Sequence, residues 1–511
     1  MRSESGLPWR SALAWPAVLI QTRPWAALLV LGLLGAAVWW AGLVLPYNVW
    51  ALDLRPLRDI AKLTRGEPAA QAAYVLTFAA LSALYYAAWR VCRGRAGPAM
   101  WRALIAGLAA ANFVLLWLYP IGAADVFDNI LRGRITAVHG GNPFYEPPRA
   151  YRSDPFYRFS AWPDATSAYG PAWELLAAGV SRLAGDHGLA NLLAHKLLGV
   201  LFYGGCAVLI ARLLRRHAPE RALQGVCLFA WNPLVLYETA GNGHNDIVMV
   251  FLVLFGLEAL SQRRPTWAAL AFMGGALVKF IPALLVPIAL AVGLRAHSGW
   301  RRLVFLAGTG LACAGLVLAA YAPFVHGGEW LRALALDRRA TLFTTSLPAF
   351  VQAQLEPRVG LVESQRLVSI VAAGATGLVA LLAAGWTWRR APTDWLTPVR
   401  AVAGVLLFYL LVACLWFQAW YAIWPLALAA LLPEGALARL IVLFSYSALW
   451  KTIIFNFWLY PGGRLPPQVW RETWLGPATL GLTWAYGAYA LVRRLRRHRL
   501  GRRGATTGTR P

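Results

Sequence analysis

Charged residues are scarce in this chain. Asp, Glu, Lys and Arg make up 14% of its 511 residues, whereas a soluble domain usually carries about 25%. Residues 25–52, 103–124, 303–328 and 367–388 contain none at all. A helix that crosses a bilayer needs about 20 mostly apolar residues and satisfies its own backbone hydrogen bonds. A soluble helical core would need polar faces at helical spacing, which these runs lack. We therefore expect an all-α, polytopic transmembrane helix bundle.

Other features of soluble enzymes are missing as well. The five cysteines have no motif spacing and lie in or beside apolar runs, which is typical of small core residues. The chain has no Walker motif and no G-x-G-x-x-G. It also lacks a convincing internal repeat of the kind that transporters show. The missing nucleotide motifs argue against a cytoplasmic nucleotide-binding enzyme, and the missing repeat argues against a transporter.

Positive charge, by contrast, is in excess. The net charge is +26, which could indicate binding to nucleic acid. However, the arginines cluster in short segments between apolar runs, at 90–102, 212–221, 263–264, 295–302, 389–390 and 493–503. This is the positive-inside pattern of cytoplasmic loops, so both termini, including the basic tail 493–511, are expected in the cytoplasm. The basic segment 55–65 is the exception, because this topology places it outside.

The arginines and the apolar runs together predict about 12–14 spans within one transmembrane domain, 1–511. We expect them near 26–45, 70–91, 101–119, 188–213, 222–240, 246–261, 266–278, 280–294, 302–322, 366–388, 399–416, 421–433, 437–455 and 474–492. This topology requires a turn between two short helices at 279–282 and a surface helix, not a span, at 169–184. Two large segments, 120–188 and 324–365, then lie outside, which predicts that the chemistry is on the outer face.

The first chemically notable segment begins just beyond the third span. Asp125 and Asp128 are three residues apart and would share one face of a helix. A carboxylate near apolar surface tends to have a raised pKa, which suits a general base. Ordinary solvated charge at the interface is the alternative for both residues. Arg132 and Arg134 follow, and then a turn-rich aromatic loop that contains Asn142.

A second polar run lies at the outer junction of two spans and contains His244, Asn245 and Asp246. Ionisable groups at membrane depth are costly and usually face a cavity. One His and one Asp two residues apart are weak evidence for a metal, and a helix cap by Asn245 or Asp246 is the alternative. Lys279, at the predicted helix break, either extends to the interface or binds an anion.

A third segment, Phe417 to Tyr421, interrupts a long uncharged run with Gln418, Trp420 and Tyr421. Aromatic residues at a membrane interface often form a lipid-facing belt. They also stack on sugar rings, so this segment is a candidate for lining a sugar cavity.

Taken in order, these motifs resemble a known family. Asp125 at the end of a span, Arg132-Gly133-Arg134, Gly141 to Phe144 and Tyr169-Gly170-Pro171 are similar to the first outer loop of GT-C glycosyltransferases. The resemblance is to the bacterial polyprenol-phosphate-mannose-dependent α-mannosyltransferases, the glycosyltransferase 87 group. Asn232-Pro233, Gly243 to Asp246 and Lys279-x-x-Pro282 follow in the same order. Many members have Arg or an aromatic residue at the position of Asp128, which leaves the role of Asp128 open.

The resemblance implies a GT-C bundle with juxtamembrane helices in the first outer loop. It implies an inverting transfer of a hexose, here mannose, from a polyprenyl-phosphate donor to a glycolipid or glycan, at the outer side of the inner (plasma) membrane. Asp125 would be the general base. The candidate substrate-binding residues are Asp128, Arg132, Arg134, Asn142, Tyr169, His244, Asn245, Asp246, Lys279, Gln418, Trp420 and Tyr421. No nucleotide, cofactor or resident metal is expected, although the superfamily admits a divalent ion.

Three other functions fit a polytopic membrane protein, one of which is a non-catalytic partner in a membrane assembly. A flippase or transporter of lipid-linked sugars predicts ionisable residues in mid-span, for which Lys196 is the main candidate. An O-antigen ligase or polymerase predicts one dominant late outer loop instead of an acidic first loop.

Overall fold

The structure is a computed structural model that describes residues 20–50, 58–325, 342–390, 394–459 and 474–506. Within these residues it is all-helical, which confirms the predicted fold class. Eight of its helical segments are long and apolar enough to cross a membrane. They are Pro24–Val44, Pro68–Cys92, Pro98–Leu116, Gly188–His217, Trp300–Phe324, Leu361–Arg390, Leu396–Ala413 and Ala436–Trp458. The chain is therefore a multi-pass membrane protein.

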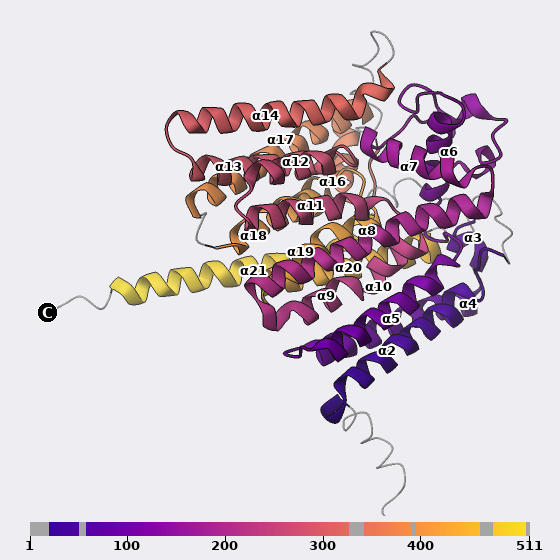
Figure 1. Cartoon of the computed structure of the whole chain (residues 1–511), viewed down its shortest axis with the longest axis horizontal. Coiled ribbons are helices and arrows are strands. Elements are labelled where there is room, and N and C mark those ends of the chain that lie inside the picture. The colour runs from indigo at the N-terminus through magenta and orange to yellow at the C-terminus, as the bar shows by residue number, and fades with distance from the viewer. Residues whose placement is uncertain (1–19, 51–57, 326–341, 391–393, 460–473, 507–511) are drawn as a thin grey trace, which may run out of the picture.

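The helices that Figure 1 labels have the following bounds. They are α2 (Pro24–Trp39), α3 (Ile60–Thr64), α4 (Pro68–Cys92), α5 (Pro98–Leu116), α6 (Asp125–Ala137), α7 (Pro171–Ala184), α8 (Gly188–His217), α9 (Ala222–Ala230), α10 (Pro233–Leu236), α11 (Asp246–Ser261), α12 (Pro265–Ala276), α13 (Val286–Ala296), α14 (Trp300–Tyr321), α16 (Leu347–Val359), α17 (Leu361–Arg390), α18 (Leu396–Phe408), α19 (Ile423–Leu431), α20 (Ala436–Ile453) and α21 (Leu475–Thr506).

Each predicted span coincides with a helix, but several of these helices are short. The stretch 222–240 is divided into α9, α10 and a π-helix, Tyr237–Gly241, because Asn232 caps α10 and Pro233 begins it. α11, α12, α13 and α19 are also shorter than a typical span. All nine residues of α19 are buried inside the bundle. The number of crossings therefore stays a prediction.

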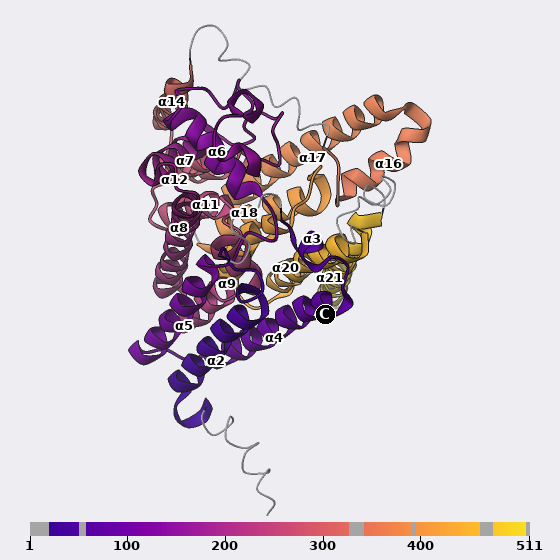
Figure 2. The ribbon, with the colours of Figure 1, turned by 90° about the vertical axis from the view of Figure 1, so that its right-hand side faces the viewer.

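Two details of the predicted topology are confirmed as local structure. α12 ends at Ala276, and the chain continues after Lys279 as a 3-10 helix, Ile281–Leu285, before α13. Pro282 cannot donate a helical hydrogen bond, which explains the break. The expected surface helix is α7, which lies with α6 at one end of the bundle (Figures 1 and 2).

The outer faces of the bundle are apolar, as expected for contact with lipid. Leu311 on α14 is 74% exposed and Val371 on α17 is 68% exposed. Inside the bundle, small residues allow close helix crossings. A Cβ on Gly32 of α2 would lie 2.6 Å from the Cα of Gly107 on α5, and small residues at such contacts are typical of membrane helices.

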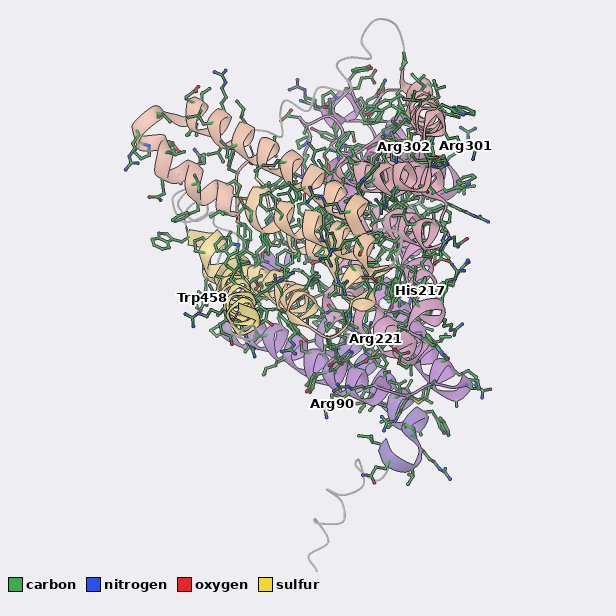
Figure 3. The ribbon with its side chains drawn as sticks, turned by 90° about the vertical axis from the view of Figure 1, so that its left-hand side faces the viewer. Arg90, His217, Arg221, Arg301, Arg302 and Trp458 are labelled. Atoms are coloured by element: carbon green, nitrogen blue, oxygen red, sulfur yellow. The ribbon has the colours of Figure 1, made fainter. Side chains whose placement is uncertain are left out.

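Arginines of several predicted cytoplasmic clusters lie at the end of the bundle opposite α6 and α7. Figure 3 views the molecule from this side and labels Arg90, Arg221, Arg301 and Arg302. Arg90 lies in the last turn of α4, Arg221 lies between α8 and α9, and α14 begins beside the other two. The predicted basic tail begins within α21, and residues 507–511 lie outside the described residues, as do Arg55 and residues 326–341.

Candidate active site

A carboxylate–histidine cluster, made of Asp125, Glu238 and His244, lies where α6 begins. The Nδ1 atom of His244 is 4.0 Å from Oδ2 of Asp125, and its Nε2 atom is 3.2 Å from Oε2 of Glu238. The side chains of His244 and Glu238 are 2% and 3% exposed, whereas that of Asp125 is 22% exposed. Asp125 is thus the member of the cluster that a substrate can reach.

The backbone around residues 237–244 explains why Glu238 and His244 lie close together. The π-helix Tyr237–Gly241 inserts an extra residue per turn, and π-helical turns are frequent at functional sites. Gly243 then has a φ of +74°, a left-handed conformation that favours glycine. The backbone N–H of His244 consequently donates to the carbonyl of Glu238 at 3.0 Å.

Asn242 connects this turn to the segment before Asp125. Its Nδ2 donates to Oε2 of Glu238 at 2.8 Å, and its Oδ1 accepts from the N–H of Gly122 at 3.0 Å. A Cβ on Gly122 would lie 2.4 Å from the Asn242 amide nitrogen. The glycine therefore allows the close approach that positions Asp125 beside His244.

A buried ion pair joins α11 to the break after α12. Lys279 donates to both oxygens of Asp246, at 2.9 and 3.0 Å, and the indole N–H of Trp424 donates to the same carboxylate at 2.6 Å. The ammonium also lies over aromatic rings, 4.3 Å from the ring centre of Tyr421 and 5.6 Å from that of Tyr169. Lys279 is therefore already paired with Asp246. An anion that binds to Lys279 would share the ammonium with that carboxylate.

Tyr169 links this ion pair to the carboxylate–histidine cluster. Burial raises the pKa of Tyr169 well above its ordinary value, and the charges of Asp125 and Asp246 raise it further. Its phenol therefore stays protonated at neutral pH and can donate a hydrogen bond. The next residue, Gly170, docks on the end of α12, where its N–H donates to the carbonyl of Val278 at 3.0 Å.

The segment Phe417 to Tyr421 faces the same site. The ring of Trp420 stacks on His244 with centres 3.9 Å apart and planes 17° from parallel. Gln418 accepts a hydrogen bond of 2.5 Å from the ammonium of Lys451 on α20. Phe417 is fully buried, so this segment packs inside the bundle and does not form a lipid-facing belt.

Two hydrogen-bond donors beside the cluster have no partner among the described residues. They are the indole N–H of Trp420 and the side-chain amide of Asn245, both atoms being buried. The alternative role of Asn245 as a side-chain cap of α11 is wrong, because its side chain makes no capping hydrogen bond. Asp246, the other predicted cap, pairs with Lys279 instead. Buried donors without acceptors are costly, and a polar ligand would satisfy them.

Asp128 stabilises the first outer loop. Its side chain accepts hydrogen bonds from the hydroxyl of Ser160 at 2.6 Å and from the N–H of Ala161 at 3.1 Å. It is 1% exposed, so the interpretation of Asp128 as a solvated charge is wrong. Burial raises the pKa of Asp128, although the nearby positive charge of Arg132 opposes that rise.

Three other predicted site residues, Arg132, Arg134 and Asn142, differ in their hydrogen-bond partners. Arg132 is buried, and its Nε has no hydrogen-bond partner among the described residues. Arg134 instead donates to Asp154 at 2.9 Å, and also to Asp186 and the carbonyl of Gly185. Asn142 donates to the carbonyl of Phe324 at 2.7 Å, which ties the first outer loop to the end of α14. A substrate contact for these three residues stays a prediction.

Sequence reasoning missed Glu238, Trp424 and Lys451 as site residues. Lys451 carried a recognisable signal, since a lone lysine in an apolar span is unusual. The lysine that was noted, Lys196, donates to the carbonyls of Leu115, Leu116 and Leu118 at 2.7–2.9 Å. It therefore caps the end of α5 and does not line a transport path.

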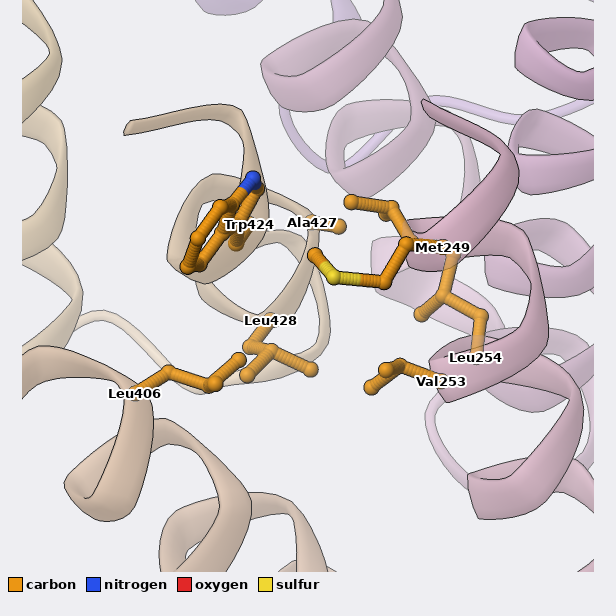
Figure 4. A pocket seen from close by; sticks show the side chains of 8 residues that line it. Met249, Val253, Leu254, Leu406, Trp424, Ala427 and Leu428 are labelled. Carbon is orange, nitrogen blue, oxygen red and sulfur yellow. The ribbon is translucent and has the colours of Figure 1, made fainter. Parts of the chain in front are cut away.

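An apolar pocket, drawn in Figure 4, lies beside Trp424, whose indole N–H donates to Asp246. It is lined by Met249, Val250, Val253, Leu254, Leu406, Trp424, Ala427 and Leu428. It has no room for a water molecule, and the indole nitrogen of Trp424 points away from it (Figure 4). Its lining therefore offers no polar partner to a sugar or phosphate. Among the described residues, no group of three or more His, Cys, Asp or Glu side chains is placed to hold a metal ion.

The fold and the site define a multi-pass membrane protein with a charged and aromatic cluster at one end of its helix bundle. Comparison with known proteins is consistent with this description. The model of the family described as alpha-(1->6)-mannopyranosyltransferase, N-terminal domain, matches residues 25–295, so the chain belongs to that family. The matched range includes Asp125, His244 and Lys279, but it ends before Gln418 and Lys451.

Two relatives illustrate the distance within the family. Alpha-(1->6)-mannopyranosyltransferase B of Corynebacterium glutamicum is 26% identical over 384 residues, which cover 68% of this chain and 61% of that protein. Alpha-(1->6)-mannopyranosyltransferase A of Mycobacterium tuberculosis is 26% identical over 339 residues, covering 63% of each. The chain thus spans a little over three-fifths of the length of each relative.

Proposed function

We propose that this protein transfers mannose from a polyprenyl-phosphate donor to a hydroxyl group of a glycolipid or glycan, at the outer face of the plasma membrane. The observation that carries the proposal is the position of Asp125. Its carboxylate is the partly exposed member of a buried cluster that also contains His244, and Lys279 and Trp420 lie beside that cluster. Family membership supports the choice of mannose.

In the proposed reaction, Asp125 accepts the proton of the acceptor hydroxyl. The acceptor oxygen attacks the anomeric carbon from one face of the sugar, and the bond from that carbon to the phosphate oxygen breaks on the other face. The electron pair stays on the phosphate, so the configuration inverts and polyprenyl phosphate leaves as an anion. A general base of this kind contributes about 10²–10⁴-fold to the rate.

A phosphate leaving group explains why one obvious base is enough. Glycoside hydrolysis needs two carboxylates, because the leaving oxygen must be protonated. A phosphate departs without a general acid, but it requires positive charge nearby. Arg132 and Lys279 can supply such charge, since Arg132 has an unpartnered Nε and Lys279 is 14% exposed.

The free donors and aromatic rings suit a sugar. The amide of Asn245 and the indole N–H of Trp420 can donate to sugar hydroxyls, which would satisfy both buried groups. The Tyr169 phenol provides a third neutral donor. We assign these three residues to positioning the mannose between Asp125 and the phosphate.

The distribution of arginines supports an outer location. α8 begins at Gly188, beside the first outer loop, and ends at His217 after Arg215 and Arg216. α5 runs in the opposite direction to α8 and agrees with this arrangement, because it begins at the arginine-rich end and leads toward Asp125. Because basic loops are retained in the cytoplasm, the cluster would face the opposite side.

Cysteine labelling in intact cells tests the location. Ser153 in the first outer loop and Arg301 at the start of α14 are exposed, whereas the five natural cysteines are buried. A membrane-impermeant maleimide should label Ser153→Cys in intact cells, and Arg301→Cys only after permeabilisation. The reverse pattern would place the cluster in the cytoplasm.

Sugar transfer by the purified protein tests the activity. The protein in lipid nanodiscs should convert a short-chain polyprenyl phosphate mannose and a mannoside acceptor into a longer α-(1→6)-linked product. Movement of the donor across proteoliposomes without new glycosidic bonds would instead identify a flippase. Use of a pyrophosphate-linked donor alone would identify a ligase or polymerase.

A further inference from the structure

Lys451 differs from the other lysines in how its charge is stabilised. The chain has four lysines, all within the described residues. Lys62 pairs with Asp59, Lys279 pairs with Asp246, and Lys196 donates to three carbonyls at the end of α5. Lys451 is 8% exposed and its ammonium donates to the neutral amide oxygen of Gln418. No described carboxylate lies within 4.0 Å of its ammonium.

A buried ammonium of this kind is costly. Removing a charge from water is offset only by an opposite charge or by several hydrogen bonds. An ammonium has three donors, and one amide oxygen satisfies only one of them. Lys451 therefore has unused capacity to bind an acceptor, and an anion would match it best.

The position of Lys451 indicates which anion. It lies in the last turn of α20, and it interacts electrostatically with Glu238 and Asp125 over a longer range. Its partner Gln418 lies two residues from Trp420, which stacks on His244. Lys451 thus adjoins the carboxylate–histidine cluster on the side of the segment 417–421, and it approaches from a helix that lies in the membrane.

We propose that Lys451 binds the phosphate of the lipid-linked donor and stabilises the charge that builds on the leaving group when the bond from the anomeric carbon to the phosphate oxygen breaks. This inference rests on the proposed function. Lysine is a common phosphate ligand because its ammonium is a compact point charge. Gln418 holds the ammonium in place, and the phosphate oxygens occupy its remaining donors.

Binding of farnesyl phosphate tests the inference, with farnesol and inorganic phosphate as the comparison ligands. The full-length protein is placed in nanodiscs of neutral phosphatidylcholine, so that no lipid headgroup carries a net negative charge. The variants are Lys451→Met, Lys451→Gln and Lys451→Arg. Lys62→Met is the matched control, since Lys62 is 36% exposed and pairs with Asp59. Thermal unfolding shows which variants are folded.

The wild-type protein should bind farnesyl phosphate at least about tenfold more tightly than farnesol. Lys451→Met and Lys451→Gln should weaken farnesyl phosphate about 10- to 100-fold, the size expected for one charged hydrogen bond, while farnesol binding is unchanged. Lys451→Arg should retain most of the affinity, and Lys62→Met all of it. Competition by inorganic phosphate at similar concentrations would indicate a site for free phosphate and would overturn the lipid-linked ligand.

Two further outcomes separate this inference from the proposed function. If wild-type protein prefers farnesyl phosphate but a folded Lys451→Met or Lys451→Gln variant binds it equally well, the role of Lys451 is refuted and the proposed donor class stands. If wild-type protein does not distinguish farnesyl phosphate from farnesol, the proposed donor class fails and the role of Lys451 fails with it.

Discussion

The ion pair between Asp246 and Lys279 provides a quantitative test of how the site is held together. The Asp246 carboxylate is completely buried, and the Lys279 side chain is 14% exposed. Removing one partner of a buried pair typically costs about 3–5 kcal/mol, because the other charge is left unpaired. In Asp246→Asn, the aromatic rings around Lys279 still contact the ammonium, and each such contact contributes about 0.5–2 kcal/mol. We therefore expect a loss of about 2–4 kcal/mol.

The assay is a double-mutant cycle on the free energy of unfolding, measured by SDS titration in mixed micelles. Lys279→Met leaves a fully buried carboxylate with the Trp424 indole as its remaining donor, so it should cost at least as much as Asp246→Asn. The double variant removes both charges and should be more stable than the sum of the single effects predicts, by about 2–4 kcal/mol. Strictly additive effects would refute the ion pair. A folded double variant that retains full transfer activity would exclude Lys279 from substrate binding.

Three other substitutions test individual contacts. Arg134→Met should lower the free energy of unfolding by up to about 3–5 kcal/mol, because the buried carboxylate of Asp154 loses its guanidinium partner and keeps only His139 and the N–H of Phe156; thermal unfolding checks this. Gly170→Ala should reduce both thermal stability and transfer activity, since its Cβ would lie 2.2 Å from the carbonyl oxygen of Leu277; a wild-type melting curve would contradict the tight docking. Glu238→Gln should slow transfer by at least about tenfold with unchanged stability, because it removes the negative charge that lies 3.2 Å from the imidazole of His244; a rate equal to wild type would show that this charge is unimportant for transfer.

The helical framework could be predicted from the sequence because its signals are local. Runs without charge mark the helices, and prolines mark their starts and breaks, as at Pro98 and Pro282. The turn beside Lys279 and the surface position of the helix at 169–184 are predicted because the arginine clusters must all lie on one side of the membrane. For short helices such as α19 the sequence does not distinguish a span from a buried helix, since an apolar run in the core of a bundle looks the same as one in lipid.

The site could be predicted only in part. Asp125, His244 and Trp420 were identified from unusual polar or aromatic positions, and the structure brings them together. Glu238 could not be assigned, because its approach to His244 depends on a π-helical turn that residue types do not reveal. Lys451 comes from a helix more than 200 residues away in sequence from His244, and no local pattern indicates that its hydrogen-bond partner is Gln418, in the segment that packs on His244.

The same limit applies to the first outer loop. Arg134 is a predicted substrate-binding residue, and its motif does not indicate that its guanidinium pairs with Asp154 and Asp186, 20 and 52 residues further along the chain. Asp128 was considered as a solvated charge, and it binds the backbone of the loop near residue 160 instead. Burial and long-range pairing decide the roles of such residues, and neither can be read from spacing alone.

The most direct test of the central claim is the rate of mannosyl transfer by Asp125→Asn in nanodiscs, measured with a short-chain polyprenyl phosphate mannose. The substitution keeps the shape of the side chain and removes its basicity. Asp164→Asn is the matched control, because Asp164 lies in the same outer loop with its side chain 73% exposed. We predict that Asp125→Asn loses about 10²–10⁴-fold in rate while it still binds farnesyl phosphate, and that Asp164→Asn is unchanged. Transfer by Asp125→Asn at the wild-type rate would contradict its role as the general base.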